Sequence, residues 1–494
     1  MNGWSLFVGF LFMVGTVCAD QLPDGQQEKP NIILMMCDDL GWGDVGFNGN
    51  SIIQTPQLDH LAEKGAVLTH FYSVGPVCSP TRASFLTGRH YYRMGVWTAN
   101  KGHLPKEEYT LARMLKKQGY ATGHFGKWHL GTLSRTVSAK GKGRRPDVNF
   151  APPWQRDYDE SFVTESAVCT WDPGLGKRAV NNPYYHNGKP VDEPPVGCDS
   201  RVIMDKAISF IRGAVNAGKP FVAVIWFHAP HEDIKAGPEY LKMYEGYGEA
   251  AHYYGCITAV DDQVGRLCSE LEDLGITENT ALFFCSDNGP EGGEPEDRLK
   301  TRRAGSSGPF SGRKRSMFDG GVRVPGMAVW PGRIAPGSRI DVPMSVLDYL
   351  PTVCEMTGAE LLPNRELDGQ NILPILLGEQ AVHEKSIPFR FRQYAGLVEG
   401  TFKLIIESPT DASSDRLFDL SNDVAEQNNV VSRYPEKAQR MRRQILEFMA
   451  SAQKSHRGDE YDAGDYSPVD PWQELGKPAD QVKRRMKSRK SGEE

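Results

Sequence analysis

The chain has 494 residues, of which 39% are hydrophobic and 24% charged, with a net charge of −6. This length and composition allow a sizeable buried core and exclude a wholly disordered chain. A mildly acidic chain repels a phosphate backbone unless it carries a concentrated basic face, so we expect no nucleic-acid partner.

Residues 1–19 have the pattern of a secretory signal peptide. An apolar run from Leu6 to Val17 leads into Val17-Cys18-Ala19, a small-x-small cleavage pattern. We therefore expect a secreted or periplasmic protein, although the run lacks a preceding Lys or Arg and Cys18 leaves lipid attachment as a weaker alternative. The run is shorter than a membrane span, and no later stretch reaches about 18 consecutive apolar residues, so no span is expected.

Residues 30–361 alternate strand-like and helix-like segments and are predicted to form the catalytic domain. The segment 31–39, "NIILMMCDD", is a short apolar run ending in two acids, which is typical of a strand buried on both faces. Segment 56–65, "PQLDHLAEKG", begins with Pro and ends with Gly, as helices do. This alternation predicts an α/β fold with helices on both faces of a large sheet. Further strands are expected at 120–128, 220–228, 280–289 and 324–332, and further helices at 110–119, 200–215, 252–275 and 346–358.

The remaining chain is predicted to hold a smaller C-terminal α+β subdomain at 362–455 and a polar basic tail at 456–494. Short alternating runs at 391–407 include Glu399-Gly400 as a hairpin turn, and one helix is expected at about 435–452. Two long polar stretches, 132–153 and 291–312, each follow a segment that carries candidate catalytic or metal-binding residues, and they are predicted to be substrate loops.

Nine cysteines in a chain predicted to be exported raise the question of disulfides. No C-x-x-C pair occurs, which argues against a zinc site. Cys169 and Cys198 flank a loop-like region and are the best candidates for a disulfide. Most others lie in apolar or helical contexts, as buried cysteines do. Cys78 fits neither class.

Oxygen-bearing side chains follow two of the predicted strands. Asp38-Asp39 closes the first strand, and Asp287-Asn288 closes the one at 280–289. Acids and Asn at strand ends are also ordinary turn formers, so neither pair alone is decisive. Together they offer hard oxygen donors without a thiolate or imidazole, which favours Ca²⁺ over Mg²⁺ and both over zinc.

Cations and imidazoles lie at other strand ends and loops. Lys127 and His129 are two residues apart at the end of a strand, so alternation sends both to one side. His228 and His231 bracket Ala-Pro after another strand, and Lys314 lies in a loop punctuated by glycines. Each taken singly could be structural. Combined with a bound cation, they suit chemistry on a tetrahedral oxyanion, which includes both sulfate and phosphate esters.

The segment 77–89, "VCSPTRASFLTGR", separates these two esters. Its C-x-P-x-R pattern, Cys78 to Arg82, resembles the signature of the type I sulfatase family, whose fold is that of alkaline phosphatase, with a large mixed sheet flanked by helices. Other blocks follow in the family's order between about residues 30 and 430: "NIILMMCDDLGWGDVGFNGN", "TGHFGKWHLG", "HAPH", "FFCSDNG" and "GRKRSMFDGGVRVP".

The resemblance implies a cofactor built from the chain itself. A formylglycine-generating enzyme would oxidise Cys78 to formylglycine, whose hydrate attacks sulfur to give a covalent sulfo-enzyme intermediate. The modified residue would bind Ca²⁺ together with four ligands: Asp38, Asp39, Asp287 and Asn288.

The resemblance also implies roles for the charged residues. Arg82 would stabilise the hydrate, and Lys127 and Lys314 would hold the sulfate. His129 would act on a hydroxyl of residue 78, and His231 would protonate the leaving oxygen.

Substrate recognition stays less defined, because specificity lies in divergent loops. His228 is a secondary candidate for substrate binding, and Trp171 with Asp172 could recognise a sugar or form a structural turn. The expected substrate is a sulfate ester of a sulfated carbohydrate. A phosphate or phosphonate ester hydrolase and a noncatalytic sulfated-glycan binder are the competing interpretations.

Overall fold

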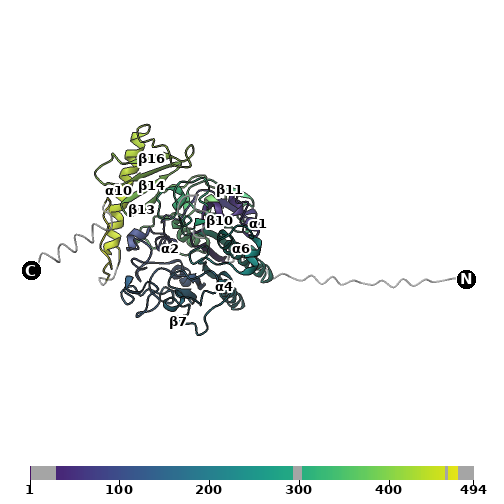
Figure 1. The fold of residues 1–494 in the computed structure, drawn as a ribbon. Helices are drawn as coiled ribbons and strands as arrows, with labels where there is room; N and C mark the ends of the chain where they lie inside the picture. The colour runs from purple at the N-terminus through teal and green to yellow at the C-terminus, as the bar shows by residue number, and fades with distance from the viewer. Residues whose placement is uncertain (2–28, 293–302, 462–465, 477–494) are drawn as a thin grey trace, which may run out of the picture.

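The computed structural model describes Met1 and residues 29–292, 303–461 and 466–476. The predicted signal peptide and the basic run at 483–494 lie outside the described residues. The body is a large sheet with helices on both sides, and a smaller unit packs against it (Figure 1). In the part of the chain that is described, no helix has both the length and the apolar character needed to cross a bilayer.

The main sheet has ten strands in the order β11-β2-β10-β9-β1-β8-β4-β5-β6-β7. The strands β9, β1, β8, β4 and β5 are parallel, whereas β10 runs antiparallel to both β9 and β2, so the sheet is mixed. This confirms the predicted α/β architecture. The strands are β1 (Asn31–Cys37), β2 (Ala66–Leu68), β4 (Ala121–Lys127), β5 (Glu160–Thr164), β6 (Tyr185–His186), β7 (Lys189–Pro190), β8 (Phe221–Trp226), β9 (Thr280–Ser286), β10 (Gly326–Val329) and β11 (Ser338–Ile340); β3 (Phe71–Tyr72) and β12 (Met344–Ser345) form a separate pair.

Alternating side chains of the central strands build two cores, one on each face of the sheet. Ile32, Leu34 and Met36 of β1 face the core that contains α2, α3 and α8, whereas Ile33 and Met35 face the core that contains α1, α4 and α6. The continuous apolar run of β1 is therefore buried on both faces, as predicted. These helices are α1 (Pro56–Glu63), α2 (Cys78–Thr87), α3 (Leu111–Lys117), α4 (Asp199–Asn216), α6 (Ala250–Asp273) and α8 (Tyr349–Thr357); shorter ones are α5 (Pro238–Met243), α7 (Asp319–Val322) and α9 (Leu373–Leu376).

The C-terminal unit is an antiparallel four-stranded sheet covered by one long helix. Its strands are β13 (Ile387–Phe391), β14 (Tyr394–Glu399), β15 (Phe402–Ile406) and β16 (Arg416–Asp419), and its helix is α10 (Pro435–Arg457). The hairpin between β14 and β15 turns at Gly400, whose φ of +58° suits glycine, which confirms the predicted turn. The helix extends five residues beyond the predicted end at 452, because its buried face continues through Ser455 and His456 and Gly458, with φ +88°, ends it. The boundaries at 361/362 and 455/456 stay predictions.

A buried charge cluster joins the C-terminal sheet to the main body. Lys403 of β15 has no exposed surface and lies 2.6 Å from Asp319 of α7 and 2.9 Å from Glu426. Tyr72 donates a hydrogen bond to the same Asp319. Beyond α10, Trp472 packs edge-on against Trp97, so part of the predicted tail belongs to the folded body.

One sequence prediction needs correction. Cys169 and Cys198 are free thiols, so the predicted disulfide is wrong. Their segments are joined by backbone instead, through a bridge between Trp171 and Cys198 and a hydrogen bond from Asp199 N to Thr170 O.

Helix α2 begins at Cys78 and has Pro80 in its first turn, where the missing N–H of proline is tolerated.

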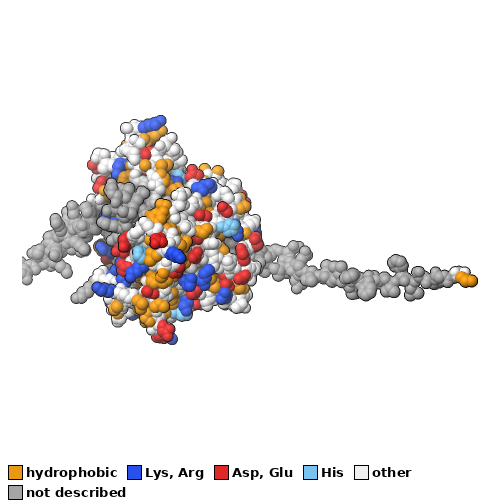
Figure 2. Space-filling view, turned by 45° about the vertical axis from the view of Figure 1, so that its right-hand side comes forward, with side chains coloured by type: hydrophobic (Ala, Val, Ile, Leu, Met, Phe, Trp, Pro, Cys, Tyr) orange, Lys and Arg blue, Asp and Glu red, His pale blue; other side chains and the backbone are white. Residues whose placement is uncertain are grey.

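Exposed charges of both signs alternate over the surface. Figure 2 shows Lys and Arg side chains interspersed with Asp and Glu over one face of the body. This mixture agrees with the modest net charge of the chain.

Candidate active site

Four oxygen-bearing side chains meet where β1 and β9 end, because neighbouring parallel strands deliver their carboxyl ends to one edge of the sheet. Asp38, Asp39, Asp287 and Asn288 are each at most 1% exposed. Asp39 adopts a left-handed conformation, φ +68°, and its N–H donates to Asp287 Oδ1 over 3.2 Å. Asn288 Nδ2 donates to Asp39 Oδ1 over 2.7 Å. The structure thus brings together all four predicted oxygen ligands.

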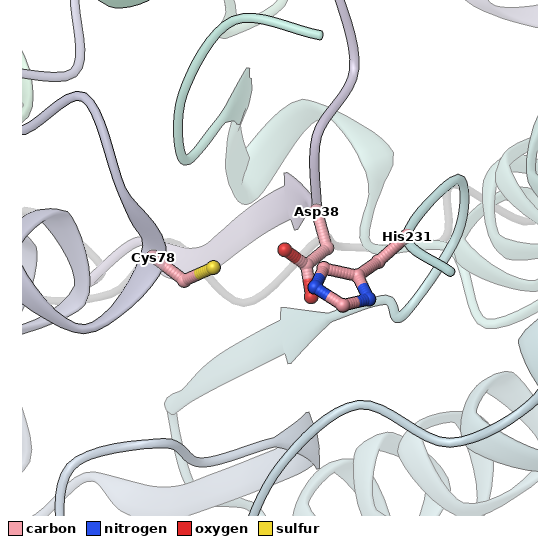
Figure 3. A group of neighbouring side chains, drawn as sticks. All are labelled: Asp38, Cys78 and His231. Carbon is pink, nitrogen blue, oxygen red and sulfur yellow. The ribbon is translucent and has the colours of Figure 1, made fainter. Parts of the chain in front are cut away.

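Cys78 is the first residue of α2, and its sulfur points toward the Asp38 carboxylate (Figure 3). One ligand atom from each of Asp38, Asp39, Cys78 and Asp287 lies within 4.8 Å of the others. Burial, with Asp38 nearby, raises the pKa of the Cys78 thiol to about 12. An unmodified Cys78 is therefore protonated at neutral pH and is a poor nucleophile.

Arg82 lies one turn further along α2 and holds the carboxylate cluster in place. It is fully buried, and its Nη2 and Nε donate to Asp287 Oδ2 over 2.6 and 3.1 Å. Its Nη1 donates to the carbonyl of Lys127 over 3.1 Å. One guanidinium therefore links the helix to the ends of β9 and β4.

Two lysines supply further positive charge. Lys127, at the end of β4, pairs with Asp38, and Lys314 pairs with Asp39 at 2.6 Å and with Glu291 at 3.3 Å. Although burial opposes it, Lys127 holds the pKa of Asp38 well below its usual range. Both predicted lysines thus contact the carboxylates that the sequence places at the strand ends.

The backbone just before Lys127 requires glycine. Gly126 has φ +98°, and a Cβ there would lie 1.9 Å from the carbonyl oxygen of Trp226 in β8. This close approach of two strands fixes where Lys127 leaves the sheet.

Two histidines approach the site from different loops. His129 follows β4 with φ +58°, and its Nε2 lies 2.8 Å from Asn100 Oδ1. In Figure 3, His231 approaches Asp38 from the side away from Cys78; its Nδ1 lies 2.5 Å from Glu232 O, and its Nε2 lies 3.8 Å from Asp39 Oδ2. Burial lowers the pKa of His231 to about 4 and that of His129 well below its usual range. Both rings are therefore neutral at pH 7 in the protein without ligands.

Three other candidates contact the protein around them. His228 is fully buried, with Asp199 2.8 Å from Nδ1 and Thr164 2.7 Å from Nε2. The ring of Trp171 packs against Gly237, and Asp172 Oδ1 accepts the N–H of Gly197 over 2.7 Å. These contacts are those of structural residues, and the substrate-binding roles of His228, Trp171 and Asp172 stay predictions.

Two residues at the site were not predicted. Asn100 orients His129, and Glu291 pairs with Lys314. Nothing in the pattern around Asn100 indicates this contact, because it depends on a turn packed beside β4. Glu291 directly follows the Asp-Asn-Gly-Pro strand end, which was the one available signal.

The cluster fits a divalent cation bound by hard oxygen ligands. Among the described residues, the buried atoms Asp38 Oδ1 and Asn288 Oδ1 have no hydrogen-bond partner. Burial, with Asp38 beside it, raises the pKa of Asp287 to about 7. The pKa of a buried carboxyl group is raised in this way by neighbouring carboxylates, and a bound positive charge lowers it again. The two unpartnered oxygens and the absence of a His ligand in the four-oxygen set suit Ca²⁺ or Mg²⁺.

Family models match most of the chain. The model "Sulfatase" matches residues 30–359, and the model "N-sulphoglucosamine sulphohydrolase, C-terminal" matches residues 308–454. The first match covers every site residue described above, and the second covers Lys314 together with the C-terminal sheet.

Characterised relatives and a solved structure agree with this match. The chain is 32% identical to N-acetylgalactosamine-6-sulfatase of Canis lupus familiaris, covering 77% of this chain and 72% of that protein. It is 34% identical to arylsulfatase A of Homo sapiens, covering 76% and 72%. The crystal structure of Ps i-CgsB in complex with k-i-k-neocarrahexaose superposes with a TM-score of 0.74 at 26% identity, covering 93% of this chain and 98% of that one. The chain belongs to the sulfatase family: it is a sulfuric ester hydrolase with an alkaline-phosphatase-like fold.

Proposed function

We propose that this enzyme hydrolyses sulfate esters of carbohydrates outside the cytoplasm, through a formylglycine made from Cys78. The observation that carries the proposal is the position of Cys78 at the start of α2. Its Sγ and one carboxylate oxygen from each of Asp38, Asp39 and Asp287 lie within 4.8 Å of one another. A thiol with a pKa of about 12 is unsuited to direct attack, whereas oxidation at this position would supply a hydrated aldehyde with a hydroxyl nucleophile.

Residue 78, Asp38, Asp39, Asp287 and Asn288 would hold the cation, with Ca²⁺ preferred over Mg²⁺. The bound cation would supply positive charge beside the sulfate oxygens. Loose mixed coordination by carboxylates and an amide suits Ca²⁺, because Mg²⁺ demands nearly ideal octahedral geometry.

Lys127 and Lys314 bind and orient the sulfate group. Both ammonium groups already lie against the carboxylate cluster, where charge develops during transfer of the sulfuryl group. Arg82 keeps the Asp287 carboxylate turned toward residue 78 through two hydrogen bonds. These residues therefore position the nucleophile and the sulfate relative to each other.

The two histidines handle different protons of the reaction. The Nδ1–H of His231 donates to Glu232 O, so Nε2 of the neutral ring faces the cluster as a proton acceptor; once Nε2 has taken up a proton, which the negative charge of a bound sulfate ester favours, it protonates the leaving oxygen. The ring of His129 is fixed by Asn100 at Nε2, so its Nδ1, which has no partner in the described part of the chain, acts on a hydroxyl of residue 78.

A carbohydrate substrate is supported by the relatives. One is named for N-acetylgalactosamine 6-sulfate chemistry, and the superposed crystal structure contains a neocarrahexaose. The apolar run at residues 6–17 supports export, and a formylglycine-generating enzyme is the partner that maturation requires.

The first test is peptide mass spectrometry of residues 70–89, on protein made in a host that contains the modifying enzyme. We expect the thiol mass to be replaced by that of the aldehyde or its hydrate, and Cys78→Ala to abolish sulfate release. An unmodified Cys78, beside a control sulfatase that is modified in the same cells, would refute the formylglycine proposal. So would wild-type sulfate release by the Cys78→Ala variant.

A matched pair of substrates tests the choice of ester. We expect kcat/KM for an aryl sulfate to exceed that for the corresponding aryl phosphate. A strong preference for the phosphate would favour the phosphate-ester alternative. Tight binding of a sulfated glycan without turnover, by protein fully modified at residue 78, would favour the noncatalytic binder.

A further inference from the structure

A second pocket, separate from the residues of the carboxylate cluster, lies beside the segment that carries His129. Its volume is about 420 Å³, and its walls come from residues 102–107, from both ends of the 132–153 loop, from Gln155 and Arg156, and from the chain around and beyond the end of α10. A backbone hydrogen bond joins the segment at 102–107 to the residue after His129, since Leu104 N donates to Leu130 O over 2.8 Å. Asn100, which orients His129, lies two residues before Gly102, where the wall at 102–107 begins.

Arg156 is the most informative residue of this pocket. Its side chain is buried, with the residue 4% exposed, yet none of the described carboxylates lies within 4.0 Å of its guanidinium. Its two Nη atoms donate to the backbone carbonyls of Gln155 and Leu104, each over 2.9 Å, and its Nε has no partner in the described chain. Burial, with Arg113 nearby, lowers its pKa to about 10, although the carboxylates of Glu107 and Asp157 act in the opposite direction. Buried guanidinium groups are usually paired directly with an anion, whereas these two carboxylates act on Arg156 from beyond ion-pair distance.

The rest of the lining combines cations with aromatic rings. Arg135 lies over the ring of Phe150, 4.3 Å from its centroid, and Lys106 and Tyr466 line the same pocket. Aromatic faces pack against the C–H faces of sugar rings, and guanidinium groups bind sulfate or carboxylate through paired hydrogen bonds.

The charge of the pocket favours an anion. Two carboxylates, Glu107 and Asp470, also line it, against three cations, Lys106, Arg135 and Arg156. Burial lowers the pKa of His103 to about 4, so this lining imidazole is neutral at pH 7. The two carboxylates can accept hydrogen bonds from sugar hydroxyls, while the guanidinium of Arg156, which has no direct carboxylate contact in the described chain, can donate to an anionic group.

We propose that this pocket binds an anionic sugar unit, through its sulfate or carboxylate group, of the same polymer whose sulfate ester is cleaved at residue 78. The proposal rests on the proposed function and deepens it, because it makes the substrate an oligosaccharide or polysaccharide with several anionic units rather than a single sulfated sugar. Arg156 and Arg135 would bind the anionic group, and Phe150 would contact the ring.

The test compares Arg156→Gln and Arg135→Gln with Arg440→Gln, which removes an exposed arginine far along the chain. Each protein is assayed with an aryl sulfate and with a length series, from mono- to hexasaccharide, of a sulfated glycan that the wild type hydrolyses. We expect each pocket variant to raise KM for the hexasaccharide about tenfold, in line with the loss of a charge-assisted hydrogen bond. Hydrolysis of the aryl sulfate and of the monosaccharide should stay within about twofold of wild type.

Three outcomes would overturn the proposal: an unchanged hexasaccharide KM in both variants, an equal loss on all substrates in variants that keep the wild-type thermal midpoint, or the same loss in Arg440→Gln. Arg156 is buried and donates to backbone carbonyls, so replacing it can also disturb folding. Arg135 is exposed, so Arg135→Gln tests the pocket without that complication. Calorimetric titration of Cys78→Ala protein with the hexasaccharide separates the two proposals. Arg156-dependent hexasaccharide binding by this variant, together with no sulfate release by wild-type protein that is fully modified at residue 78, would refute the proposed function and leave the pocket proposal standing.

Discussion

Replacing Lys403 with Met should destabilise the protein far more than removing a surface cation. Lys403 has no exposed surface, and its ammonium group is held between Asp319 and Glu426 at 2.6 and 2.9 Å. Removing it leaves two carboxylates buried, and among the described residues the cation that still contacts them is Arg323, 3.5 Å from Asp319. Breaking a buried ion pair from one side costs about 3–5 kcal/mol, so we expect the free energy of unfolding to fall by about that amount.

The matched control is Arg440→Met, which removes a pair with Glu399 whose two side chains are 48% and 28% exposed. Exposed pairs contribute about 0–1 kcal/mol, so this variant should unfold nearly as the wild type does. Urea unfolding followed by tryptophan fluorescence and by far-UV circular dichroism measures both variants. A loss below about 1 kcal/mol for Lys403→Met, or equal losses for the two variants, would refute the view that this cluster fastens the C-terminal sheet to the body.

Three further predictions concern the metal site, a histidine and a glycine. Chelator treatment should lower the thermal midpoint, and Ca²⁺ should restore it more fully than Mg²⁺; an unchanged midpoint contradicts the metal assignment. Asp348 raises the pKa of His383 despite burial, so this pair stabilises the fold below about pH 6.5 and loses its effect as pH rises through the raised value; stability curves of wild type and His383→Gln should therefore converge at alkaline pH. Gly126→Ala should remove sulfate release by displacing Lys127, whereas Gly119→Ala, also at positive φ but with open space around it, should cost only about 1 kcal/mol of stability and keep activity.

The carboxylate cluster could be predicted from the sequence because it depends on a regular feature. Asp38 and Asp287 directly follow apolar runs, and parallel pairing of β1 with β9 necessarily places those two chain positions at one edge. Lys127 is the last residue of β4, a third strand of the same parallel set, two places from β1 in the sheet order. The roles of these residues, by contrast, came from the resemblance and not from their spacing.

Contacts that depend on irregular loops could not be predicted. His228 and His231 belong to one four-residue segment, and only the turn between them decides that one ring is buried against Asp199 while the other faces Asp39. The pairing of Cys169 with Cys198 was wrong for the same reason. The sequence shows that the two cysteines flank a loop-like region, but it does not show that the two segments are joined through backbone hydrogen bonds and not through their side chains.

The burial of α2 constrains when the proposed oxidation of Cys78 could take place. Cys78, Ser79, Thr81 and Arg82 are each at most 2% exposed, so the segment that the modifying enzyme is proposed to recognise is inaccessible in the folded protein. An enzyme that binds this peptide in its own cleft would therefore have to act before the chain folds. Under the proposed function, a polypeptide that folds first would keep its thiol until it unfolds again, so the yield of active enzyme would be set by the relative rates of oxidation and folding.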